Sequence, residues 1–321
     1  MKIHRGLPAA DARAPVALTI GNFDGVHRGH QALLRQVVVA AHARGVAPAV
    51  MTFEPHPREF FTPEQAPARI ANLRDKLEAL HACGIERVFI QHFNRRFARL
   101  TAEQFIADVL IAGCRARWLM VGDDFRFGAR RAGDIDLLRQ YAAAGGFEVV
   151  QCPTVSDDGE RISSSAVRHA LAAGDLQRAQ RLLGRPYAIS GRVQHGAKLG
   201  RSIGFPTLNL RIAHAKRMRS AAVHGVFAVR VHGLAPQALD GVASVGLRPT
   251  VDDSGRWLLE VHLFDFAQQV YGRLVRVEFV RKLRDEEKYD SVAALTAAIR
   301  RDAEHARALF ASGDLAPQAT I

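Results

Sequence analysis

The sequence predicts an α/β protein of two parts, a parallel α/β domain followed by a small antiparallel β-barrel. In the first half, short apolar runs alternate with amphipathic helical patterns, as in a parallel sheet with right-handed crossovers. From about residue 184 the apolar runs become short, glycine-bounded and partly alternating, which is typical of antiparallel strands. A long helical pattern closes the chain. We therefore expect one domain over residues 1–184 and a barrel with a C-terminal helix over residues 185–321.

The elements of the first domain follow from these patterns in turn. The expected strands are 16–20, 49–53, 87–91, 118–121 and 147–152, and the expected helices are 32–43, 73–83, a helix from Thr101 and 134–144. Gly45 and Gly84 mark the ends of the first two helices, and Glu103 and Gln104 favour a first turn after Thr101. Ligands of parallel sheets bind beyond the carboxyl ends of the strands, so the loops that follow those ends are the candidate sites.

The elements of the second part are shorter. Two short helices, expected at 164–172 and 175–182, still precede the boundary near residue 184. Beyond it, strands are expected at 188–193, 226–231, 241–245, 258–264 and 275–279, and the closing helix at 292–310. We see no internal repeat and no low-complexity segment in the sequence.

The composition is that of a globular protein, with 48% hydrophobic and 24% charged residues among 321. No apolar run has the length of a signal peptide or a membrane span, so we expect no membrane association. Cys83, Cys114 and Cys152 form no CxxC pair, which favours core packing in a reducing cytoplasm. The net charge of +12 attracts polyanions or a small anion such as ATP. The spread of arginines along the chain favours either the small anion or a simple compositional bias.

The most informative segment directly follows the first expected strand and reads GNFDGVHRGH, from Gly21 to His30. A helix start presents unpaired N–H groups to an anion, and two imidazoles at that place add donors for phosphate oxygens. The plainer alternative is a turn with two surface histidines. Our candidate residues here are His27 and His30 for contacts with phosphate, with Gly21, Asn22, Phe23, Asp24 and Gly29 for nucleotide binding.

This segment resembles the signature of nucleotidyltransferases that carry an HxGH motif, a family with a Rossmann-like parallel sheet. Two further segments narrow the resemblance to the FMN adenylyltransferase module of bacterial bifunctional enzymes: VGDDFRFG at 121–128 and RISSSAVR at 161–168. The resemblance implies that His27 and His30 stabilise the phosphates as pyrophosphate leaves. The nucleotide-binding candidates that it adds are Asp124, Ser163, Ser164, Ser165 and Arg168. Ser165 stands where the family usually has threonine, which keeps the hydroxyl.

The second part opens with a glycine-rich, basic segment at 191–209 that ends in a Pro-Thr-x-Asn turn. Backbone amides of such a loop suit phosphate, whereas the segment does not match the P-loop template. The candidates for ATP binding are Gly196, Lys198, Gly200, Gly204, Pro206, Thr207 and Asn209. Thr207 and Asn209 also offer oxygens to a divalent cation held on ATP phosphates. An ordinary hairpin with a Pro-Thr turn is the alternative.

Phosphoryl transfer to an alcohol also needs a group that accepts the hydroxyl proton. Glu260, an acidic residue between apolar neighbours of an expected strand, is the candidate, although a lone strand glutamate is more often simply solvated. The segments GRSIGFPTLNL, GVASVGLRPTV and LEVHLFDF resemble riboflavin kinase, in order, over most of residues 185–310. The resemblance implies that Glu260 activates the ribityl hydroxyl. Leu208 and Ser244 depart from the usual alanine and asparagine, and the basic stretch 213–223 carries no prediction.

The two resemblances together predict a bifunctional enzyme that phosphorylates riboflavin to FMN and adenylates FMN to FAD. Its expected substrates and products are Mg²⁺-bound ATP, riboflavin, FMN and FAD. One rival is a chain with a single working site. The other is an RNA- or DNA-binding protein, suggested by the basic-aromatic segments 93–97 and 125–131. A nucleic-acid binder leaves Thr207, Asn209 and Glu260 unexplained, so we expect small-molecule substrates and no nucleic acid. The sequence leaves the oligomeric state open.

Overall fold

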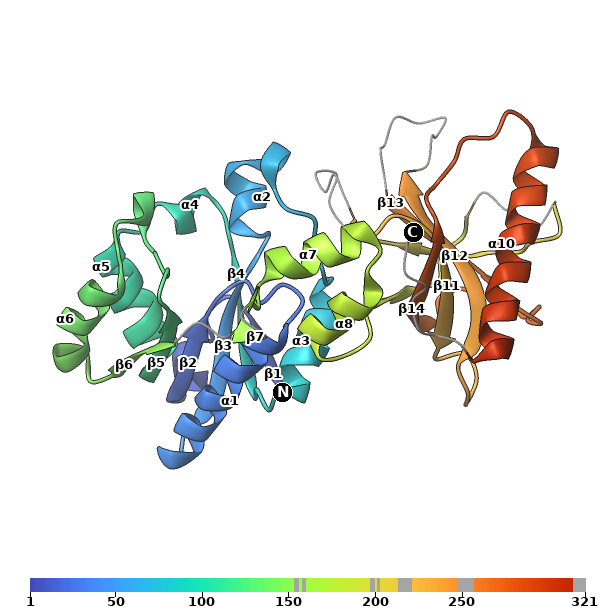
Figure 1. Cartoon of the computed structure of the whole chain (residues 1–321). Coiled ribbons are helices and arrows are strands. Elements are labelled where there is room, and N and C mark those ends of the chain that lie inside the picture. The colour runs from blue at the N-terminus through green and yellow to red at the C-terminus, as the bar shows by residue number, and fades with distance from the viewer. Residues whose placement is uncertain are drawn as a thin grey trace. The chain divides into compact units, whose positions relative to one another are not determined.

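The protein consists of two compact units (Figure 1). This computed structural model describes residues 1–152, 156–157, 160–196, 200, 203–212, 221–247 and 257–313. The sheet unit comprises Met1–Ala66 and Lys76–Ser163, and the barrel unit comprises Pro67–Asp75 and Ser164–Ile321. The domain boundary at residue 184 stays a prediction.

The sheet unit is built on a six-stranded parallel sheet of order β1-β4-β3-β2-β5-β6. Its strands are β1 (Lys2–Arg5), β2 (Val16–Ile20), β3 (Ala47–Glu54), β4 (Arg87–His92), β5 (Ala116–Gly122) and β6 (Glu148–Cys152). The chain passes from β2 to β4 on one side of β2 and then crosses to β5 and β6 on the other. The order therefore reverses between β2 and β5, which is where open α/β sheets bind ligands.

Helices cover both faces of this sheet. On one face, α1 (Arg28–Ala43) packs Val37, Ala40 and Ala41 against Ala17 and other strand residues. The other face is covered by α5 (Ala102–Gln104), the π-helical η3 (Phe105–Gly113) and α6 (Ile135–Gly145). The remaining elements are η1 (Ala10–Ala12), α2 (Pro57–Phe61), η2 (Pro63–Gln65), α3 (Leu73–Ala82), α4 (Arg95–Ala98), η4 (Ala129–Arg131), β7 (Ser156–Asp157) and β8 (Glu160–Arg161).

The five strands predicted for this unit are present. The short edge strand β1 was not predicted, because its residues are mostly exposed and polar and therefore show no buried apolar run. The first helix was predicted from residue 32, but α1 begins at Arg28. The residue that caps α1 is His27, and histidine is not among the usual N-cap residues, so the earlier start was not evident from the sequence.

The barrel unit opens with α7 (Ser164–Ala173) and α8 (Leu176–Leu183). A six-stranded antiparallel sheet follows in the order β10-β13-β12-β11-β14-β9. Its strands are β9 (Ala188–Arg192), β10 (Leu208–Arg211), β11 (Gly225–His232), β12 (Leu239–Leu247), β13 (Trp257–Leu263) and β14 (Leu274–Arg284). A bridge between Gln194 and Asn209 joins its two edges and nearly closes the barrel.

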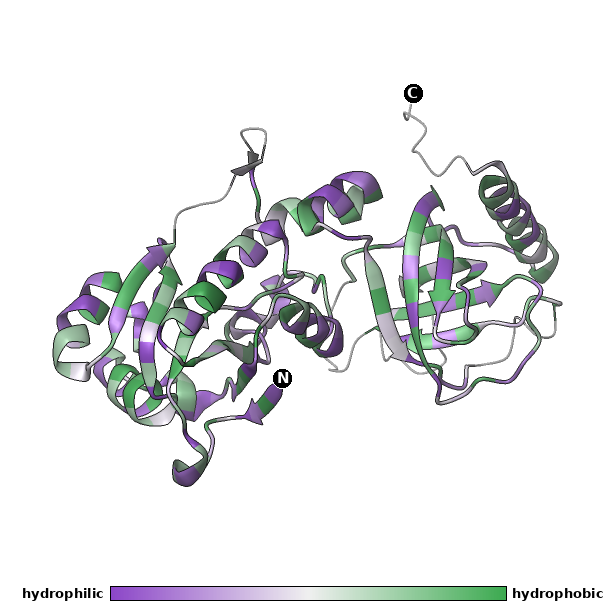
Figure 2. Cartoon of the chain, turned by 90° about the horizontal axis from the view of Figure 1, so that it is seen from below, coloured by the Kyte–Doolittle hydropathy of each residue, from purple (hydrophilic) through white to green (hydrophobic). Residues whose placement is uncertain are grey.

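The closing helix α10 (Val292–Ser312) packs on the barrel strands (Figure 1). Ala303 and Ala306 contact the cluster that contains Val226, Ala228 and Val242. Hydrophobic and hydrophilic residues alternate along the barrel strands and around α10 (Figure 2), as the sequence predicted. The prediction of a parallel α/β domain followed by a small barrel and a C-terminal helix is confirmed. Within the described residues, no helix combines the length and apolar character that a membrane crossing requires.

Candidate functional sites

The loop between β2 and α1 has an unusual backbone. Phe23, Gly25 and Val26 have φ values of 47°, 83° and 41°, in the left-handed region. Glycine adopts this conformation freely, but for phenylalanine and valine it is strained. Both side chains are buried, with exposures of 2% and 0%. Core packing thus holds a strained turn beyond the end of β2, and such strain is typical of functional sites.

This turn delivers two histidines to the first turn of α1. His27 caps the helix, and its Nδ1 accepts a hydrogen bond from the His30 backbone N–H at 3.3 Å. The two imidazole rings are stacked, with centroids 3.7 Å apart and planes inclined by 21°. A Cβ at Gly29 would lie 3.2 Å from the His27 ring and from the Ile162 carbonyl oxygen, so glycine gives these groups room. Both histidines therefore stand at a helix start, where the sequence predicted them.

Burial lowers the pKa of His30 well below its ordinary value, and the neighbouring charges of His27 and Lys76 act in the same direction. The His30 Nδ1 is buried and has no hydrogen-bond partner among the described residues. Both effects favour the neutral form of the His30 imidazole. A bound phosphate would raise the pKa of His30, because a nearby anion favours the charged imidazolium.

A large pocket lies over these histidines in the sheet unit, with a volume of about 1140 Å³. Of the residues proposed from the sequence, those that line it are Gly21, Asn22, Phe23, Gly29, His30 and Asp124. Asp24 and His27 are buried, each with an exposure of 5%, and neither lines the pocket. The segments after β2 and β5, which are about a hundred residues apart in the sequence, thus meet at the point where the strand order reverses.

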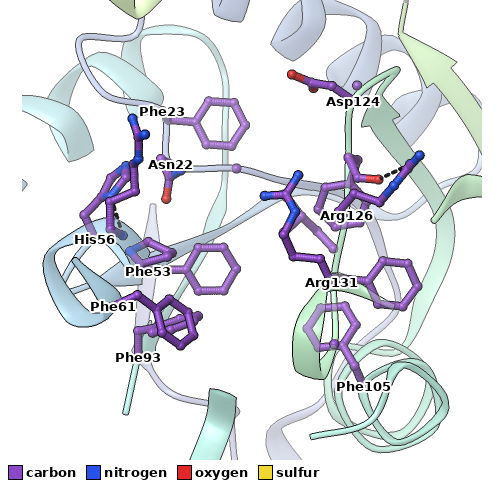
Figure 3. Close-up of a pocket in the computed structure, with 18 of the residues that line it drawn as sticks. Asn22, Phe23, Phe53, His56, Phe61, Phe93, Phe105, Asp124, Arg126 and Arg131 are labelled. Carbon is purple, nitrogen blue, oxygen red and sulfur yellow. Dashed lines mark hydrogen bonds between the residues drawn. The ribbon is translucent and has the colours of Figure 1, made fainter. Parts of the chain in front are cut away.

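Two walls of this pocket were not predicted as part of the site. Phe53, Phe61 and Phe93 gather on one side (Figure 3), and Phe93 packs edge-on against Phe53 and Phe61, with ring centroids 5.8 and 5.5 Å apart. Arg126 and Arg131 lie across the pocket from them, and Arg131 extends toward its middle (Figure 3). The sequence signal for these walls is the pair of basic-aromatic segments 93–97 and 125–131, both of which contribute residues to the pocket.

The loop that carries Arg126, Arg130 and Arg131, here called the arginine wall, also has a strained backbone. Arg130 and Arg131 have φ values of 56° and 60°. Neither guanidinium pairs with a carboxylate in the described part of the chain. Strained backbone that presents two unpaired cations to a pocket is suited to an anionic ligand.

The hydroxyl-rich segment after residue 161 spans both units. Ser163 ends the sheet unit, whereas Ser164, Ser165 and Arg168 belong to α7 of the barrel unit. The Arg168 Nε donates a hydrogen bond of 2.7 Å to the Ala68 carbonyl oxygen. The part of these four residues in nucleotide binding stays a prediction.

In the barrel unit, strand pairing brings together residues from distant segments. Asn209 on β10 lies directly opposite Glu260 on β13, and Glu260 lies opposite Ser244 on β12. Directly opposed residues point to the same face of a sheet, with Cβ atoms about 4.5–5.5 Å apart. The Ser244 hydroxyl donates a 2.7 Å hydrogen bond to Glu286. The sequence placed Asn209 in a turn, but it is the second residue of a strand, and this strand position sets it beside Glu260.

Asn209 is buried, with an exposure of 5%, and its Oδ1 has no hydrogen-bond partner among the described residues. Within the described segments, its Nδ2 makes a single long hydrogen bond of 3.4 Å, to the Thr207 carbonyl oxygen. A Cβ at Gly196 would overlap this amide, so only glycine lets the loop lie against it. Amide oxygens are good ligands for Mg²⁺ and Ca²⁺, and an unsatisfied, buried one fits a cation carried by ATP.

Thr207 directly precedes β10 and is half-buried, next to the exposed Pro206. Both line a cleft of about 240 Å³ together with the segment 266–271. The Gly200 carbonyl oxygen accepts a 2.7 Å hydrogen bond from the Phe205 N–H, and Gly204 follows in the same turn with a φ of 86°. Lys198 lies outside the described residues, as does most of the basic stretch 213–223.

Comparison with known proteins adds an independent observation. Residues 9–166 match the family model of FAD synthetase, and residues 183–310 match that of riboflavin kinase. A protein of Escherichia coli strain K12, named bifunctional riboflavin kinase/FMN adenylyltransferase, is 48% identical over 97% of this chain and 98% of its own. The chain belongs to this bifunctional family.

The prediction of a riboflavin kinase joined to an FMN adenylyltransferase is therefore confirmed. A member of the bifunctional family from Pseudomonas fluorescens is 47% identical over 97% of this chain and 98% of its own. A crystal structure described as a macrolide-efflux protein from Streptococcus pneumoniae is 33% identical. It covers 92% of this chain and 95% of its own, with a TM-score of 0.73. The description of that structure names efflux. The two curated relatives instead carry the bifunctional name, and the two family models match its two activities.

Proposed function

We propose that the two activities of the family are carried by two sets of residues, one in each unit. In the barrel unit, Thr207 and Asn209 attend Mg²⁺-bound ATP, and Glu260 accepts the proton of the riboflavin 5′-hydroxyl. The observation that carries this proposal is the β10–β13 register, which sets Asn209 opposite Glu260. A nucleotide-holding amide and a carboxylate base on one face are what phosphoryl transfer to an alcohol requires.

The proposed kinase reaction follows from this arrangement. The hydroxyl oxygen of riboflavin attacks the γ-phosphorus of ATP, the bond between that phosphorus and the β,γ-bridging oxygen breaks, and ADP leaves. Glu260 takes the hydroxyl proton. The cation bound to ATP neutralises charge on the phosphates, and the buried, unsatisfied Oδ1 of Asn209 is a fitting ligand for it.

In the sheet unit, we propose that FMN and a second ATP occupy the pocket over α1. The FMN phosphate attacks the α-phosphorus of ATP, and pyrophosphate leaves as FAD forms. The nucleophile is already an anion, so this step needs no general base, and stabilisation of the departing charge dominates. His30 lines the pocket, and the ring of His27, which caps α1, stacks on the His30 ring, so both are assigned to that task.

The two walls of the pocket support the same proposal. A flavin ring is a flat aromatic surface, and the phenylalanines of the first wall offer faces and edges for it. Arg130 and Arg131, which pair with no carboxylate of the described residues, offer positive charge for phosphate groups. The substrates thus remain small molecules, and we keep the predictions of no nucleic-acid partner and of a place in the cytoplasm, where thiols such as Cys114 stay reduced.

Separate assays of the half-reactions test these assignments. Glu260→Gln should lower FMN formation from riboflavin by about 10²–10⁴-fold, the usual contribution of general-base catalysis. The same variant should convert supplied FMN to FAD at the wild-type rate. His27→Ala should form FMN at the wild-type rate and lose most of the conversion of supplied FMN to FAD. Glu304→Gln, on the outer surface of α10, is a matched control for Glu260→Gln and should leave both rates unchanged. Loss of both activities in either folded variant would contradict the assignment of one set of residues to each reaction.

A further inference from the structure

His262 connects two parts of the proposed kinase site, the strand that carries Glu260 and the turn that carries Thr207. It lies on β13, two residues after Glu260. Its Nδ1 is 3.0 Å from the carbonyl oxygen of Pro206, the residue before Thr207. Because a carbonyl oxygen only accepts, the Nδ1 must carry the hydrogen and donate. The imidazole ring is also held edge-on against Phe205, at 5.2 Å between ring centroids.

This hydrogen bond fixes more than the Pro206 carbonyl. The peptide group is planar, so the carbonyl oxygen of Pro206 and the N–H of Thr207 belong to one rigid plane. An imidazole that holds the oxygen therefore sets the direction of the Thr207 N–H and the starting orientation of the Thr207 side chain. Pro206 has no N–H of its own, so its carbonyl is the only backbone group through which this residue can be hydrogen-bonded.

The same strand carries the proposed base. Residues two apart on a strand point to the same face, so His262 and Glu260 share the face on which Asn209 lies. The nucleotide-binding turn is thereby joined to β13 at two places: through the β10–β13 pairing at Asn209, and through the hydrogen bond from His262 to Pro206. A single rigid strand thus sets the position of the base relative to the turn.

We propose that His262 is a positioning residue of the kinase site. It holds the Pro206–Thr207 peptide so that the Thr207 hydroxyl and the Glu260 carboxylate face the same reacting group, and it makes no contact with substrate itself. This inference rests on the roles proposed above for Thr207 and Glu260.

The first test separates positioning from general support of the fold. His262→Ala should lower kcat for FMN formation by about ten- to a hundredfold, the cost of a misplacement near 1 Å, and leave the KM for riboflavin within about twofold. His262→Asn should recover most of that loss, because an asparagine Nδ2 can stand near the place of the imidazole Nδ1. His262→Gln, whose amide reaches farther, should not. Adenylation of supplied FMN by the same proteins is the internal control.

A merely structural role would lower the melting temperature of the kinase unit in the alanine and glutamine variants and leave kcat unchanged well below that temperature. Equal kcat in the wild type and His262→Ala would overturn the proposal. So would equal kcat in the asparagine and glutamine variants.

The second test asks whether His262 acts through Thr207. In a double-mutant cycle, Thr207→Ala alone should lower kcat, and adding His262→Ala should lower it by less than about threefold more. A full ten- to hundredfold further loss would show that His262 does not act through Thr207, and the inference would fall while the proposed function stands. If Thr207→Ala alone had no effect, the proposed function of Thr207 would fall first.

Discussion

Replacing Asn209 with leucine should make the ligand-free kinase unit more stable while removing its response to Mg²⁺-bound ATP. The reason lies in the buried Oδ1, which has no partner in the described part of the chain. An unsatisfied buried acceptor costs about 1–3 kcal/mol. Leucine has nearly the shape of asparagine and removes both polar atoms. The hydrogen bond that would be lost, from Nδ2 to the Thr207 carbonyl, is long at 3.4 Å and is worth roughly 0.5 kcal/mol.

The net expectation is a gain of roughly 0.5–2.5 kcal/mol in the free energy of unfolding of Asn209→Leu without ligand. At a ligand concentration of about 100 Kd, Mg²⁺-bound ATP should stabilise the wild type by about 2.7 kcal/mol and the variant much less. The order of stability of the two proteins should therefore reverse on addition of ligand.

Urea unfolding followed by tryptophan fluorescence can measure this. The chain has 2 tryptophans, Trp118 in β5 and Trp257 at the start of β13, so a Trp118→Phe background leaves a reporter in the barrel unit alone. Kinase activity in the same samples should fall with the loss of the ligand response. If Asn209→Leu were less stable without ligand and kept the full response to Mg²⁺-bound ATP, the assignment of Asn209 to the nucleotide would be wrong.

Three further expectations follow from the structure. The lowered pKa of His30 means that the unfolded chain takes up a proton below about pH 6.5 while the folded protein does not, so stability falls as the pH falls through that value. In His30→Gln, the free energy of unfolding should therefore decrease less between about pH 7.5 and about pH 5.5 than in the wild type. An unchanged decrease would contradict this. Arg131→Ala should raise the KM for FMN roughly tenfold through loss of a charge-assisted hydrogen bond, whereas Arg139→Ala, outside the pocket, should leave the KM unchanged. Asp302→Ala should lower the free energy of unfolding of the barrel unit, measured by calorimetry, by about 2–3 kcal/mol. The Arg284 guanidinium, 25% exposed, donates hydrogen bonds of 2.9 and 2.7 Å to the two Asp302 carboxylate oxygens and would lose both. A change below about 0.5 kcal/mol would show that the pair contributes little.

The sequence sufficed for what depends on local pattern. Alternation of strands and helices predicted the parallel sheet, and the end of the first strand pointed to the loop that carries His27 and His30. The lone glutamate of β13 was singled out because the surrounding segment resembles riboflavin kinase. These features are encoded within a few residues of one another.

What the sequence could not show depends on long-range pairing. The strand β10 has only four residues, Leu208–Arg211, directly after a proline, so no periodicity reveals it. The register that sets Asn209 opposite Glu260 joins residues about fifty positions apart in the sequence. The arginine wall likewise depends on how a loop folds over the end of β5, and the left-handed backbone of Arg130 and Arg131 leaves no mark on the residue types.

Mixing two variants, each deficient in one step, tests the central claim most directly. His27→Ala alone, given riboflavin, Mg²⁺ and ATP, should accumulate FMN, and Glu260→Gln alone should leave riboflavin unchanged. Together in one tube they should produce FAD, because FMN released by the first protein is adenylated by the second. If the mixture formed no FAD while the wild type did so under the same conditions, the assignment of the two reactions to independent residue sets would be wrong.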